Sequence, residues 1–356
     1  MVNSKLKIEV LTPRLQSNEN KYLTCLWSSL NDYNVQINAF SILCSFFELL
    51  LEKHHNKIIH LHWVRVLCFF DSKNKYKTLI YFLITIRNLI TLRLLGNKIV
   101  WTVHNTHTHN NNFPVLEHIL RWFLSRICSD IIVMSEYSRK EFAHMYGRTK
   151  QVHIIPHGNY IGSYPNQVSR SDARLRLGIA PKRKVILYFG MVRHYKGINN
   201  LIAAFNQIEN PNVILLIAGI PFDRDLCAEI EQAARKNPKI QLRLEYIPDE
   251  DIQIYMNACD WVVLPYQKIL NSGSVLLALS FARPVIAPQK GSIPELISNK
   301  KQGYCYDKDC NLLATINNAL ATTDEEWEEM CTQAYALAQK YDWSKIGYQL
   351  YQIYSY

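Results

Sequence analysis

Imidazole side chains, which can exchange protons near neutral pH, gather in the first half of the chain. Eleven of the twelve histidines lie before residue 166. They concentrate where two expected strands end, with His60 and His62 at one and His104, His107 and His109 at the other. A neutral histidine near its usual pKa is a competent general base for a hydroxyl group. His104, which follows a strand directly, is the predicted catalytic base.

Other roles for these histidines stay open from the residues alone. His104 could donate or accept a hydrogen bond from a substrate without taking a proton, or the loop histidines could have no chemical role. The spacing His-x-x-His-x-His from His104 to His109 could bind zinc, but no carboxylate lies close to it in the sequence. We therefore expect no metal ion and no cofactor.

A second group of chemistry-bearing residues lies in the turn Tyr188–Gly197. A buried strand ends at Gly190, and a helix is expected to start at Gly197. Two cations, Arg193 and Lys196, lie between them. Glycine lets the backbone approach a ligand closely, and cations beside a helix N-terminus suit a diphosphate. The turn is therefore a predicted phosphate-binding site.

Two further turns in the second half carry polar residues after strand ends. In the loop 264–275, Ser272, Gly273 and Ser274 open an expected helix. Free backbone N–H groups and two hydroxyls would make a cradle for an anion there. A simple serine cap would explain the same residues. The other turn, 287–296, carries Glu295.

The elements that must position these residues alternate between strand and helix, which predicts parallel sheets covered by helices. In the first half, short apolar runs predict strands at Lys7–Leu11, Val35–Phe40, Ile58–Leu61, Ile99–Val103, Ile131–Met134 and Val152–Ile155. In the second half they predict strands at Val185–Phe189, Val213–Ala218, Ile240–Leu244, Trp261–Leu264 and Pro284–Ala287. The expected fold class is α/β, with two doubly wound units whose ligands bind beyond the carboxyl ends of the strands.

Length and one polar stretch predict where the chain divides. Its 356 residues are long for one domain and comfortable for two. Residues 161–172, rich in Ser, Asn, Gly and Pro, form the predicted linker. The expected domains are residues 1–165 and residues 166–335, followed by a closing segment at 336–356.

Charge is distributed unevenly between the two halves. Residues 1–165 hold 19 basic residues against 10 acidic ones, whereas the whole chain has 40 and 30. A basic half indicates an anionic partner, such as a membrane surface or a lipid phosphate. A solvated basic surface without a partner stays an alternative. We expect no nucleic acid partner, because the sequence carries no helix or sheet signature for reading one.

Cysteine usage and hydropathy predict a cytoplasmic protein without a membrane span. The nine cysteines are scattered and include no Cys-x-x-Cys pair, so neither a disulfide framework nor a structural zinc site is expected. The longest apolar stretch, Thr78–Leu95, contains two arginines and an asparagine and is too polar to span a bilayer. Three lysines precede it, so it could lie on a membrane as a basic amphipathic helix or be an ordinary core helix.

The order and spacing of the segments in the second half resemble the nucleotide-binding domain of GT-B glycosyltransferases. The resemblance is strongest to glycosyl transferases group 1, the bacterial group that includes lipid-linked mannosyl- and glucosyltransferases. The turn from Gly190 through Lys196 and Gly197 matches their Gly-x-x-x-x-x-Lys-Gly pattern. Similar segments follow at Leu244–Ile252, Tyr255–Asp260, Val263–Pro265, Ala282–Ala287, Gly291, Glu295 and Tyr341–Tyr354. The resemblance implies two Rossmann-like domains that face each other across a cleft.

This resemblance assigns a role to each expected domain. The second would bind a nucleotide diphosphate sugar, with Arg193 and Lys196 on its diphosphate and further contacts from Gly190, Ile247, Ser272, Gly273, Ser274 and Glu295. The first would bind a glycolipid or oligosaccharide acceptor through Asn20, Tyr22, His62 and His107, with His104 beside the transferred sugar. The closing segment would be a helix that packs back on the first domain.

One feature departs from the retaining members of this family. Those enzymes carry two Glu residues eight positions apart, which correspond here to Ile269 and Leu277. Neither apolar side chain can bond a sugar hydroxyl, and no Glu lies between Asp260 and Glu295. We therefore expect an inverting enzyme that takes its base from the first domain, or an inactive homologue.

The predicted function is transfer of a sugar from a nucleotide diphosphate sugar to a lipid-linked or polysaccharide acceptor. The expected setting is surface-polysaccharide synthesis, as in capsule or exopolysaccharide assembly, by a peripheral protein on the inner face of the plasma membrane. Two alternatives stay open, because a fold alone does not fix a reaction. One is a non-catalytic homologue that binds a sugar nucleotide or glycan, and the other is a sugar-nucleotide epimerase.

Overall fold

The computed structural model describes residues 8–13, 20–51, 55–68, 70, 72–105 and 112–355 of the chain. The chain divides into two compact units. Unit 1 comprises Met1–Gly158 together with Trp343–Tyr356, and unit 2 comprises Asn159–Asp342. The division after Gly158 precedes the boundary that the sequence predicts after residue 165, and the last helix belongs to unit 1.

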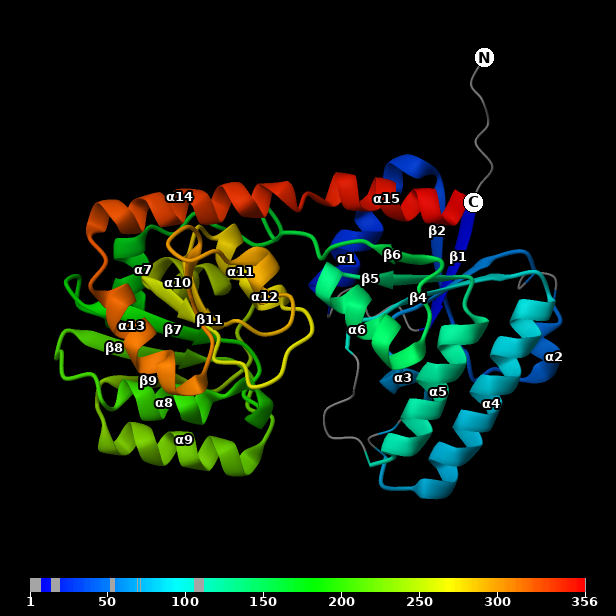
Figure 1. Ribbon diagram of the computed structural model, residues 1–356, viewed down its shortest axis with the longest axis horizontal. Helices are drawn as coiled ribbons and strands as arrows, with labels where there is room; N and C mark the ends of the chain where they lie inside the picture. Colours follow the sequence, from blue (N-terminus) through cyan, green and yellow to red (C-terminus); the bar gives the residue numbers. More distant parts are fainter. Residues whose placement is uncertain are drawn as a thin grey trace, which may run out of the picture. The chain divides into compact units, whose positions relative to one another are not determined.

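Unit 1 is built on a six-stranded sheet (Figure 1). Its strands are β1 (Ile8–Pro13), β2 (Val35–Phe40), β3 (Ile58–Leu61), β4 (Lys98–Thr102), β5 (Asp130–Val133) and β6 (Val152–Ile154). They lie in the order β2-β1-β3-β4-β5-β6, and each neighbouring pair is parallel. The strand order reverses between β1 and β3. Ligands of doubly wound sheets bind beyond the carboxyl ends of strands at such a reversal, so this edge is where a site is expected.

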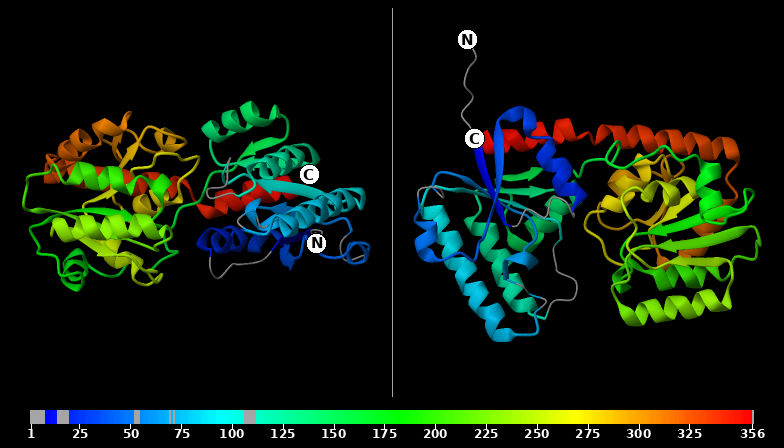
Figure 2. Two further views of the ribbon diagram at one scale, coloured as in Figure 1. Left: turned by 90° about the horizontal axis from the view of Figure 1, so that it is seen from below. Right: turned by 180° about the vertical axis from the view of Figure 1, so that it is seen from behind.

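Helices cover both faces of this sheet (Figure 2). They are α1 (Lys21–Ser28), α2 (Phe46–Leu49), α3 (Arg65–Cys68), α4 (Lys75–Leu94), α5 (Pro114–Ile127), α6 (Glu136–Tyr146) and α15 (Trp343–Ser355). One apolar cluster joins α2 through α6 to the sheet, with Leu89 and Leu120 fully buried in it. The other joins α1 and α15 to the opposite face through Leu26 and Leu350.

Close backbone approaches position α15 in unit 1. A Cβ atom added to Gly347 would lie 2.3 Å from the carbonyl oxygen of Ser29, at the end of α1. A Cβ atom added to Gly158 would lie 2.2 Å from a ring atom of Trp343. Any larger side chain at either glycine would therefore separate α15 from the elements beneath it.

Unit 2 is a second six-stranded parallel sheet. Its strands are β7 (Lys184–Phe189), β8 (Val213–Ala218), β9 (Ile240–Arg243), β10 (Trp261–Val263), β11 (Val285–Pro288) and β12 (Gly303–Tyr306). The order is β12-β11-β10-β7-β8-β9, which reverses between β7 and β10. The predicted phosphate-binding turn follows β7 and the predicted anion cradle follows β10, so both lie at the reversal.

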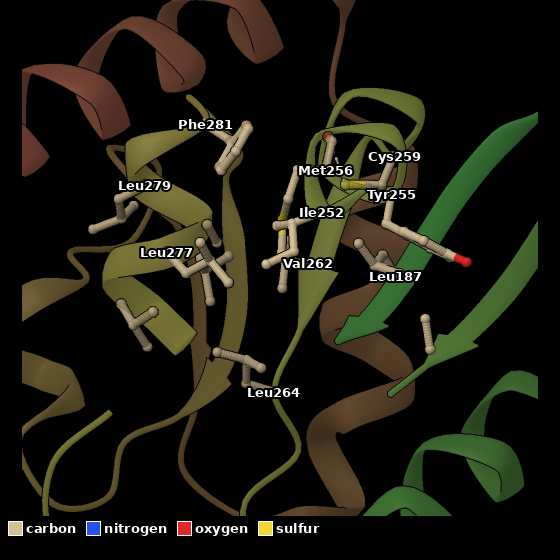
Figure 3. Packing of buried hydrophobic residues seen from close by; sticks show 14 of the residues in the cluster. Leu187, Ile252, Tyr255, Met256, Cys259, Val262, Leu264, Leu277, Leu279 and Phe281 are labelled. Carbon is tan, nitrogen blue, oxygen red and sulfur yellow. Dashed lines mark hydrogen bonds between the residues drawn. The ribbon is translucent and has the colours of Figure 1, made fainter. Parts of the chain in front are cut away.

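The helices of unit 2 are α7 (Arg170–Arg176), α8 (Ile198–Phe205), α9 (Arg224–Lys236), α10 (Ile252–Ala258), α11 (Gly273–Ser280), α12 (Ile293–Leu296), α13 (Leu312–Leu320) and α14 (Asp324–Lys340). One core cluster packs α10 and α11 on the sheet, and Figure 3 shows Met256, Val262 and Leu277 among its side chains. A second cluster packs α8, α9 and α13 on the sheet.

The predicted linker at 161–172 is wrong. Ile161, Tyr164 and Val168 pack against the core of unit 2. The side chain of Gln253 accepts hydrogen bonds from the backbone N–H groups of Gln167 and Val168, at 2.8 and 3.1 Å. The polar composition of this stretch reflects its many turns, which are bonded to unit 2 along their length.

A buried carboxylate, Asp260, joins the start of β10 to α7 in unit 2. It is 1% exposed, and its Oδ2 accepts hydrogen bonds from Arg174 Nη2 at 3.0 Å and from the backbone N–H of Val185 at 2.6 Å. Its Oδ1 pairs with Arg170. Removing this carboxylate would leave the buried Arg174 without its counter-charge.

We expect Asp260→Ala to lower the free energy of unfolding of unit 2 by about 3–5 kcal/mol, as for other broken buried ion pairs. Urea unfolding of the full chain, followed by far-ultraviolet circular dichroism, measures the change. Asp324→Ala is the matched control, because Asp324 is 82% exposed in its 3.0 Å pair with Lys184 and should cost less than about 1 kcal/mol. Equal effects of the two substitutions would contradict the structural role of Asp260.

Candidate active site

Histidine side chains meet in unit 1 at the carboxyl ends of β3 and β4. His62 directly follows β3, and His104 lies just beyond β4. The two strands are parallel neighbours with Leu61 paired to Trp101, so the residues that follow them meet at one edge of the sheet. Nδ1 of His62 lies 3.0 Å from Nε2 of His104. The structure thus brings together two predicted site residues, one of them the predicted base.

The hydrogen bond between the two imidazoles has two alternative proton positions. Two neutral rings need one N–H donor and one lone-pair acceptor. If Nε2–H of His104 donates, its other nitrogen, Nδ1, carries a lone pair and can accept a proton. If Nδ1–H of His62 donates, Nδ1 of His104 already carries the proton and His104 is no base. General-base catalysis therefore requires the first arrangement.

His60 shows what a structural histidine looks like beside this pair. Its Nδ1 lies 2.5 Å from Tyr354 Oη, and its Nε2 lies 2.8 Å from Thr102 Oγ1. Both nitrogens are bonded and the side chain has no exposed surface. His62 differs, because its Nε2 is buried with no hydrogen-bond partner in the described part of the chain.

Aromatic rings hold His104 in place. The indole of Trp63 stacks on its imidazole, with ring centroids 4.4 Å apart and an interplanar angle of 16°. The ring of Tyr22 meets it edge-on at 5.1 Å and 89°. Tyr22 also contacts His157 at 4.8 Å and Trp343 at 5.7 Å. These contacts restrict rotation of the His104 ring.

Burial keeps the histidines of this cluster neutral. It lowers the pKa of His60 to about 3, with a smaller effect from His104, and the pKa of His157 to about 4. Burial, followed by the charge of neighbouring histidines, also lowers the pKa values of His62 and His104 well below the usual range. A neutral His104 at physiological pH has a lone pair available for a proton.

The depressed histidine pKa values are expected to make unit 1 sensitive to acid. Because the pKa values are lower in the folded chain, the unfolded chain binds more protons between roughly pH 4 and pH 6.5. Stability of unit 1 should therefore be complete above about pH 6.5 and fall as the pH drops below it. Unit 2 should change less over this range, since it contains one histidine against eleven in unit 1. Differential scanning calorimetry of the full chain measures both transitions, and equal shifts of the two would contradict the prediction.

The predicted acceptor contacts are only partly placed by the structure. Asn20 is the N-cap of α1, and its Oδ1 accepts a hydrogen bond from the N–H of Tyr22 at 3.1 Å. This cap starts α1 where Tyr22 reaches His104. His107, like His109, lies outside the described residues. Contacts of Asn20, Tyr22, His62 and His107 with an acceptor stay predictions.

Glycines bring three loops of unit 2 together at the carboxyl edge of its sheet. Gly190 follows β7 with φ +137°, and a Cβ atom added to Gly219, after β8, would lie 2.1 Å from the Gly190 carbonyl oxygen. A Cβ atom added to Gly197, which has φ +74°, would lie 1.9 Å from the carbonyl oxygen of Pro265. The turn after β7 thus lies against both the β8 and β10 loops.

The two predicted phosphate-binding cations lie in this turn, where Arg193 precedes the short 3₁₀ turn η3 (His194–Lys196) and Lys196 is its last residue. Arg193 is 7% exposed, and its guanidinium carbon lies 3.4 Å from the centroid of the Phe222 ring. Nζ of Lys196 lies 4.3 Å from the ring centroid of Tyr266. Aromatic faces therefore hold both cations by cation–π contact.

The N-terminus of α11 lies beside Lys196. Tyr266 Oη is 3.2 Å from Ser272 Oγ, and Ser272 caps α11 by accepting a hydrogen bond from the N–H of Val275 at 3.3 Å. A Cβ atom on Gly190 would lie 3.9 Å from Ser274 Oγ. Ser272, Gly273 and Ser274 thus share one place with the β7 turn. Free N–H groups at a helix start attract anions, so the arrangement suits a diphosphate.

Two other predicted donor contacts have a different setting. Ile247 is 7% exposed and packs in the core of unit 2. Glu295, on α12, is exposed, and its charge helps to raise the pKa of Tyr341 after burial of that phenol. Their contacts with a donor stay predictions, as do those of Gly190, Arg193, Lys196 and the α11 start.

The positions that carry glutamates in retaining relatives are apolar in the structure as well. Leu277 is 8% exposed and lies within the core cluster of unit 2. Ile269 packs against the same cluster, and its carbonyl oxygen would lie 2.3 Å from a Cβ atom on Gly291. Within the described residues no group of three histidine, cysteine, aspartate or glutamate side chains could hold a metal ion.

The aromatic residues that hold the reactive groups were not predicted as site residues. They are Trp63, His157 and Trp343 in unit 1, and Phe222 and Tyr266 in unit 2. Trp63 and Tyr266 lie two and three residues beyond the ends of β3 and β10, and this position was the signal that could have indicated them. Trp343 lies far along the chain from His104, so no sequence spacing points to it.

Comparison with known proteins decides the enzyme class. Residues 169–336 match the family model Glycosyl transferases group 1, and residues 75–159 match Glycosyltransferase Family 4. The chain is also 29% identical over 345 residues to a GDP-mannose:glycolipid 4-beta-D-mannosyltransferase of Xanthomonas campestris pv. campestris, covering 96% of this chain and 90% of the relative. Residues 169–336 form a group 1 glycosyltransferase domain. The predicted family and enzyme class are confirmed.

Solved structures confirm the GT-B fold of this glycosyltransferase. HepE of Anabaena in complex with UDP-glucose superposes with a TM-score of 0.74 at 19% identity, covering 98% of this chain and 99% of HepE. Sucrose-phosphate synthase of Thermosynechococcus elongatus gives 0.78 at 16% identity, covering 98% of each chain. At such identities the likeness shows the fold alone.

Proposed function

We propose that this glycosyltransferase moves a sugar from a nucleotide diphosphate sugar to a lipid-linked or polysaccharide acceptor with inversion at the anomeric carbon. The observation that carries the proposal is the hydrogen-bonded pair of neutral histidines, His62 and His104, at the strand ends of unit 1. No acidic side chain replaces the missing glutamate pair at Ile269 and Leu277 in unit 2. In the proposed reaction, a histidine base in unit 1 takes the proton of the acceptor hydroxyl, and no glutamate pair is needed in unit 2.

Unit 2 is the proposed donor site. Arg193 and Lys196 carry charge opposite to a diphosphate, and the free N–H groups at the start of α11 add hydrogen-bond donors. These groups are already fixed by Phe222, Tyr266 and Ser272. Preorganised donors of this kind stabilise the negative charge that develops on the leaving nucleoside diphosphate. The cations do this work in the proposed reaction without a metal ion.

The proposed chemical step is a single displacement. The acceptor hydroxyl oxygen forms a bond to the anomeric carbon while the bond from that carbon to the diphosphate oxygen breaks. The hydroxyl proton moves to Nδ1 of His104, whose Nε2–H donates to Nδ1 of His62. The nucleoside diphosphate leaves with the electron pair of the broken bond. In this step His62 acts as a positioning residue, because its Nδ1 accepts the hydrogen bond that leaves Nδ1 of His104 unprotonated.

The similar Xanthomonas enzyme supports an inverting reaction and a lipid-linked acceptor. Its name specifies GDP-mannose, a glycolipid and a 4-beta-D-mannosyl product. GDP-mannose holds its sugar in the α configuration, so a β product corresponds to inversion. We extend this to the present chain as a glycolipid acceptor in surface-polysaccharide synthesis, such as capsule or exopolysaccharide assembly. The enzyme would then act from the inner face of the plasma membrane as a peripheral protein.

Thermal unfolding with a panel of ligands tests the donor site. A ligand that binds only the folded state raises the melting temperature. We expect one nucleotide class among GDP, UDP and dTDP, with its sugar conjugates, to stabilise the wild-type chain and to have no effect on Lys196→Ala. Stabilisation followed by no sugar transfer would favour a non-catalytic sugar-nucleotide-binding homologue. No stabilisation by any nucleotide would refute the donor site.

A further inference from the structure

Helix α4 exposes an apolar side, unlike an ordinary surface helix. Toward the core of unit 1 it buries Phe82, Leu89 and Leu92 together with three polar residues, Thr78, Thr85 and Asn88. Away from the core it exposes six large apolar or aromatic residues by 42% to 82%, namely Tyr76, Leu79, Ile80, Leu83, Ile90 and Leu94. A helix on a water-exposed surface normally shows the opposite pattern. The outer side of α4 is therefore suited to an apolar environment.

The neighbouring helices extend this surface. Exposed apolar residues also occur on α5, at Val115, Ile119 and Trp122, on α2, at Phe46 and Phe47, and just after α2, at Leu50 and Leu51. We call these residues and the six on α4 the apolar face. On α4, most of its members recur at intervals of three, four or seven residues from Tyr76 to Leu94, a line about 27 Å long.

The three helices present the apolar face in one direction. α4 packs between α2 and α5, and Leu49, Leu89 and Leu120 bury their inner sides in the same cluster against the same face of the sheet. The Arg87 guanidinium lies 5.9 Å from the ring of Phe46, which joins α4 to α2. Figure 2 shows α4 and α5 side by side in both views.

The charge around the apolar face is positive. No aspartate or glutamate occurs from residue 72 to residue 116, a stretch that holds six lysines and arginines. Lys73, Lys75 and Lys77 are exposed at the start of α4, with Arg93 and Arg126 exposed at the ends of α4 and α5. The acidic residue of α5, Glu117, is buried in a 2.6 Å pair with Arg121. On α2, Glu48 is exposed and accepts a hydrogen bond from Ser45 N–H.

Unit 2 supplies an internal comparison. Helix α9 also lies on the outside of its sheet, yet its exposed positions are mostly charged or polar, such as Asp225, Glu229 and Arg235. The exposed apolar residues of α2, α4 and α5 are thus not shared by every outer helix of the chain. Within the described part of the chain, no helix is long and apolar enough to cross a membrane.

We propose that the apolar face binds an anionic lipid bilayer, with α4 and α5 lying in the plane of the interface. Apolar side chains bury in the boundary between headgroups and acyl chains, tryptophan and tyrosine favour this depth, and lysine and arginine meet anionic headgroups at the rim. The inference extends the proposed function, since it gives an enzyme with a glycolipid acceptor a surface that contacts the membrane holding this acceptor.

Vesicle co-sedimentation of the full chain tests this surface. We expect wild-type protein to sediment with vesicles of phosphatidylcholine and phosphatidylglycerol, and much less with phosphatidylcholine alone. Ile80→Glu with Leu83→Glu should weaken sedimentation at least about tenfold, and neutralising Lys73, Lys75 and Lys77 to glutamine should weaken it roughly 10- to 100-fold. Leu175→Glu, at an apolar residue of unit 2 that is 78% exposed, is the matched control and should sediment like wild type.

The remaining outcomes separate this inference from the proposed function. An Ile80→Glu, Leu83→Glu enzyme should keep its melting temperature and its transfer rate on a water-soluble acceptor analogue, and lose transfer to an acceptor embedded in vesicles. Sedimentation unaffected by these substitutions, or an apolar face covered by a second copy in gel filtration, would overturn the membrane surface and leave the donor site standing. Vesicle binding by a chain that no nucleotide stabilises would support the surface and refute the proposed function.

Discussion

Replacing His104 with alanine is expected to lower kcat by about 10²- to 10⁴-fold, which is the usual contribution of a positioned general base. The reason is that the acceptor hydroxyl loses the lone pair at Nδ1 that takes its proton. The donor-induced rise in melting temperature should be unchanged, because the donor site lies in unit 2. Steady-state transfer assays with the identified donor measure kcat and KM separately.

Two further variants test the His62–His104 hydrogen bond. His62→Phe keeps a ring at the site and removes the 3.0 Å contact, so it should lower kcat less than His104→Ala and move the acidic limb of the pH–rate profile. His144→Ala, at an exposed histidine of α6, is the control and should leave kcat unchanged. Wild-type kcat in His104→Ala would show that His104 is no base.

Replacing Lys196 with alanine is expected to lower kcat/KM for the nucleotide sugar by about 10²- to 10³-fold, as for the loss of one preorganised oxyanion donor. Arg193→Ala should have a comparable effect. Both substitutions remove positive charge where negative charge develops on the leaving diphosphate, so kcat should fall together with donor affinity. Arg193→Lys tests whether the planar guanidinium group is needed in addition to its charge, because lysine keeps the charge and loses the planar group that lies on Phe222.

Lys184→Ala is the matched control for the donor-site variants. Lys184 begins β7, at the strand end opposite the Gly190 turn, and its pair with Asp324 is exposed. It should therefore bind and turn over donor like wild type. Equal losses in Lys184→Ala and Lys196→Ala would indicate a general charge effect and contradict a specific diphosphate site.

The fold could be predicted from the sequence because its signals are local. Short buried strands such as Val213–Ala218 appear as continuous apolar runs between turn residues, and the structure has β8 with the same bounds. The polar stretch 161–172 led to a predicted boundary after residue 165, whereas the structure divides the chain after Gly158. The difference has a physical reason. The backbone groups of this stretch at Gln167 and Val168 are bonded to Gln253 and Asn257, which lie far along the chain, and local composition carries no trace of such partners.

The candidate site was predictable only where it follows strand ends. His62, His104 and Lys196 stand in such positions, and parallel strands bring their ends together. The rings that fix them come from elsewhere, since Trp343 reaches Tyr22 from the last helix and Phe222 reaches Arg193 from the β8 loop. The exposed apolar side of α4 was predicted only as one of two alternatives, because periodicity shows which residues share a side but not which side faces the core.

The measurement that tests the central claim most directly is the anomeric configuration of the product. The chain would be incubated with the stabilising nucleotide sugar and a glycolipid acceptor, and the one-bond carbon–hydrogen coupling at the new anomeric carbon would be read by NMR. We predict a configuration opposite to that of the donor, with product formation lost in His104→Ala. A product that retains the donor configuration would contradict the single displacement and the role of His104 as its base.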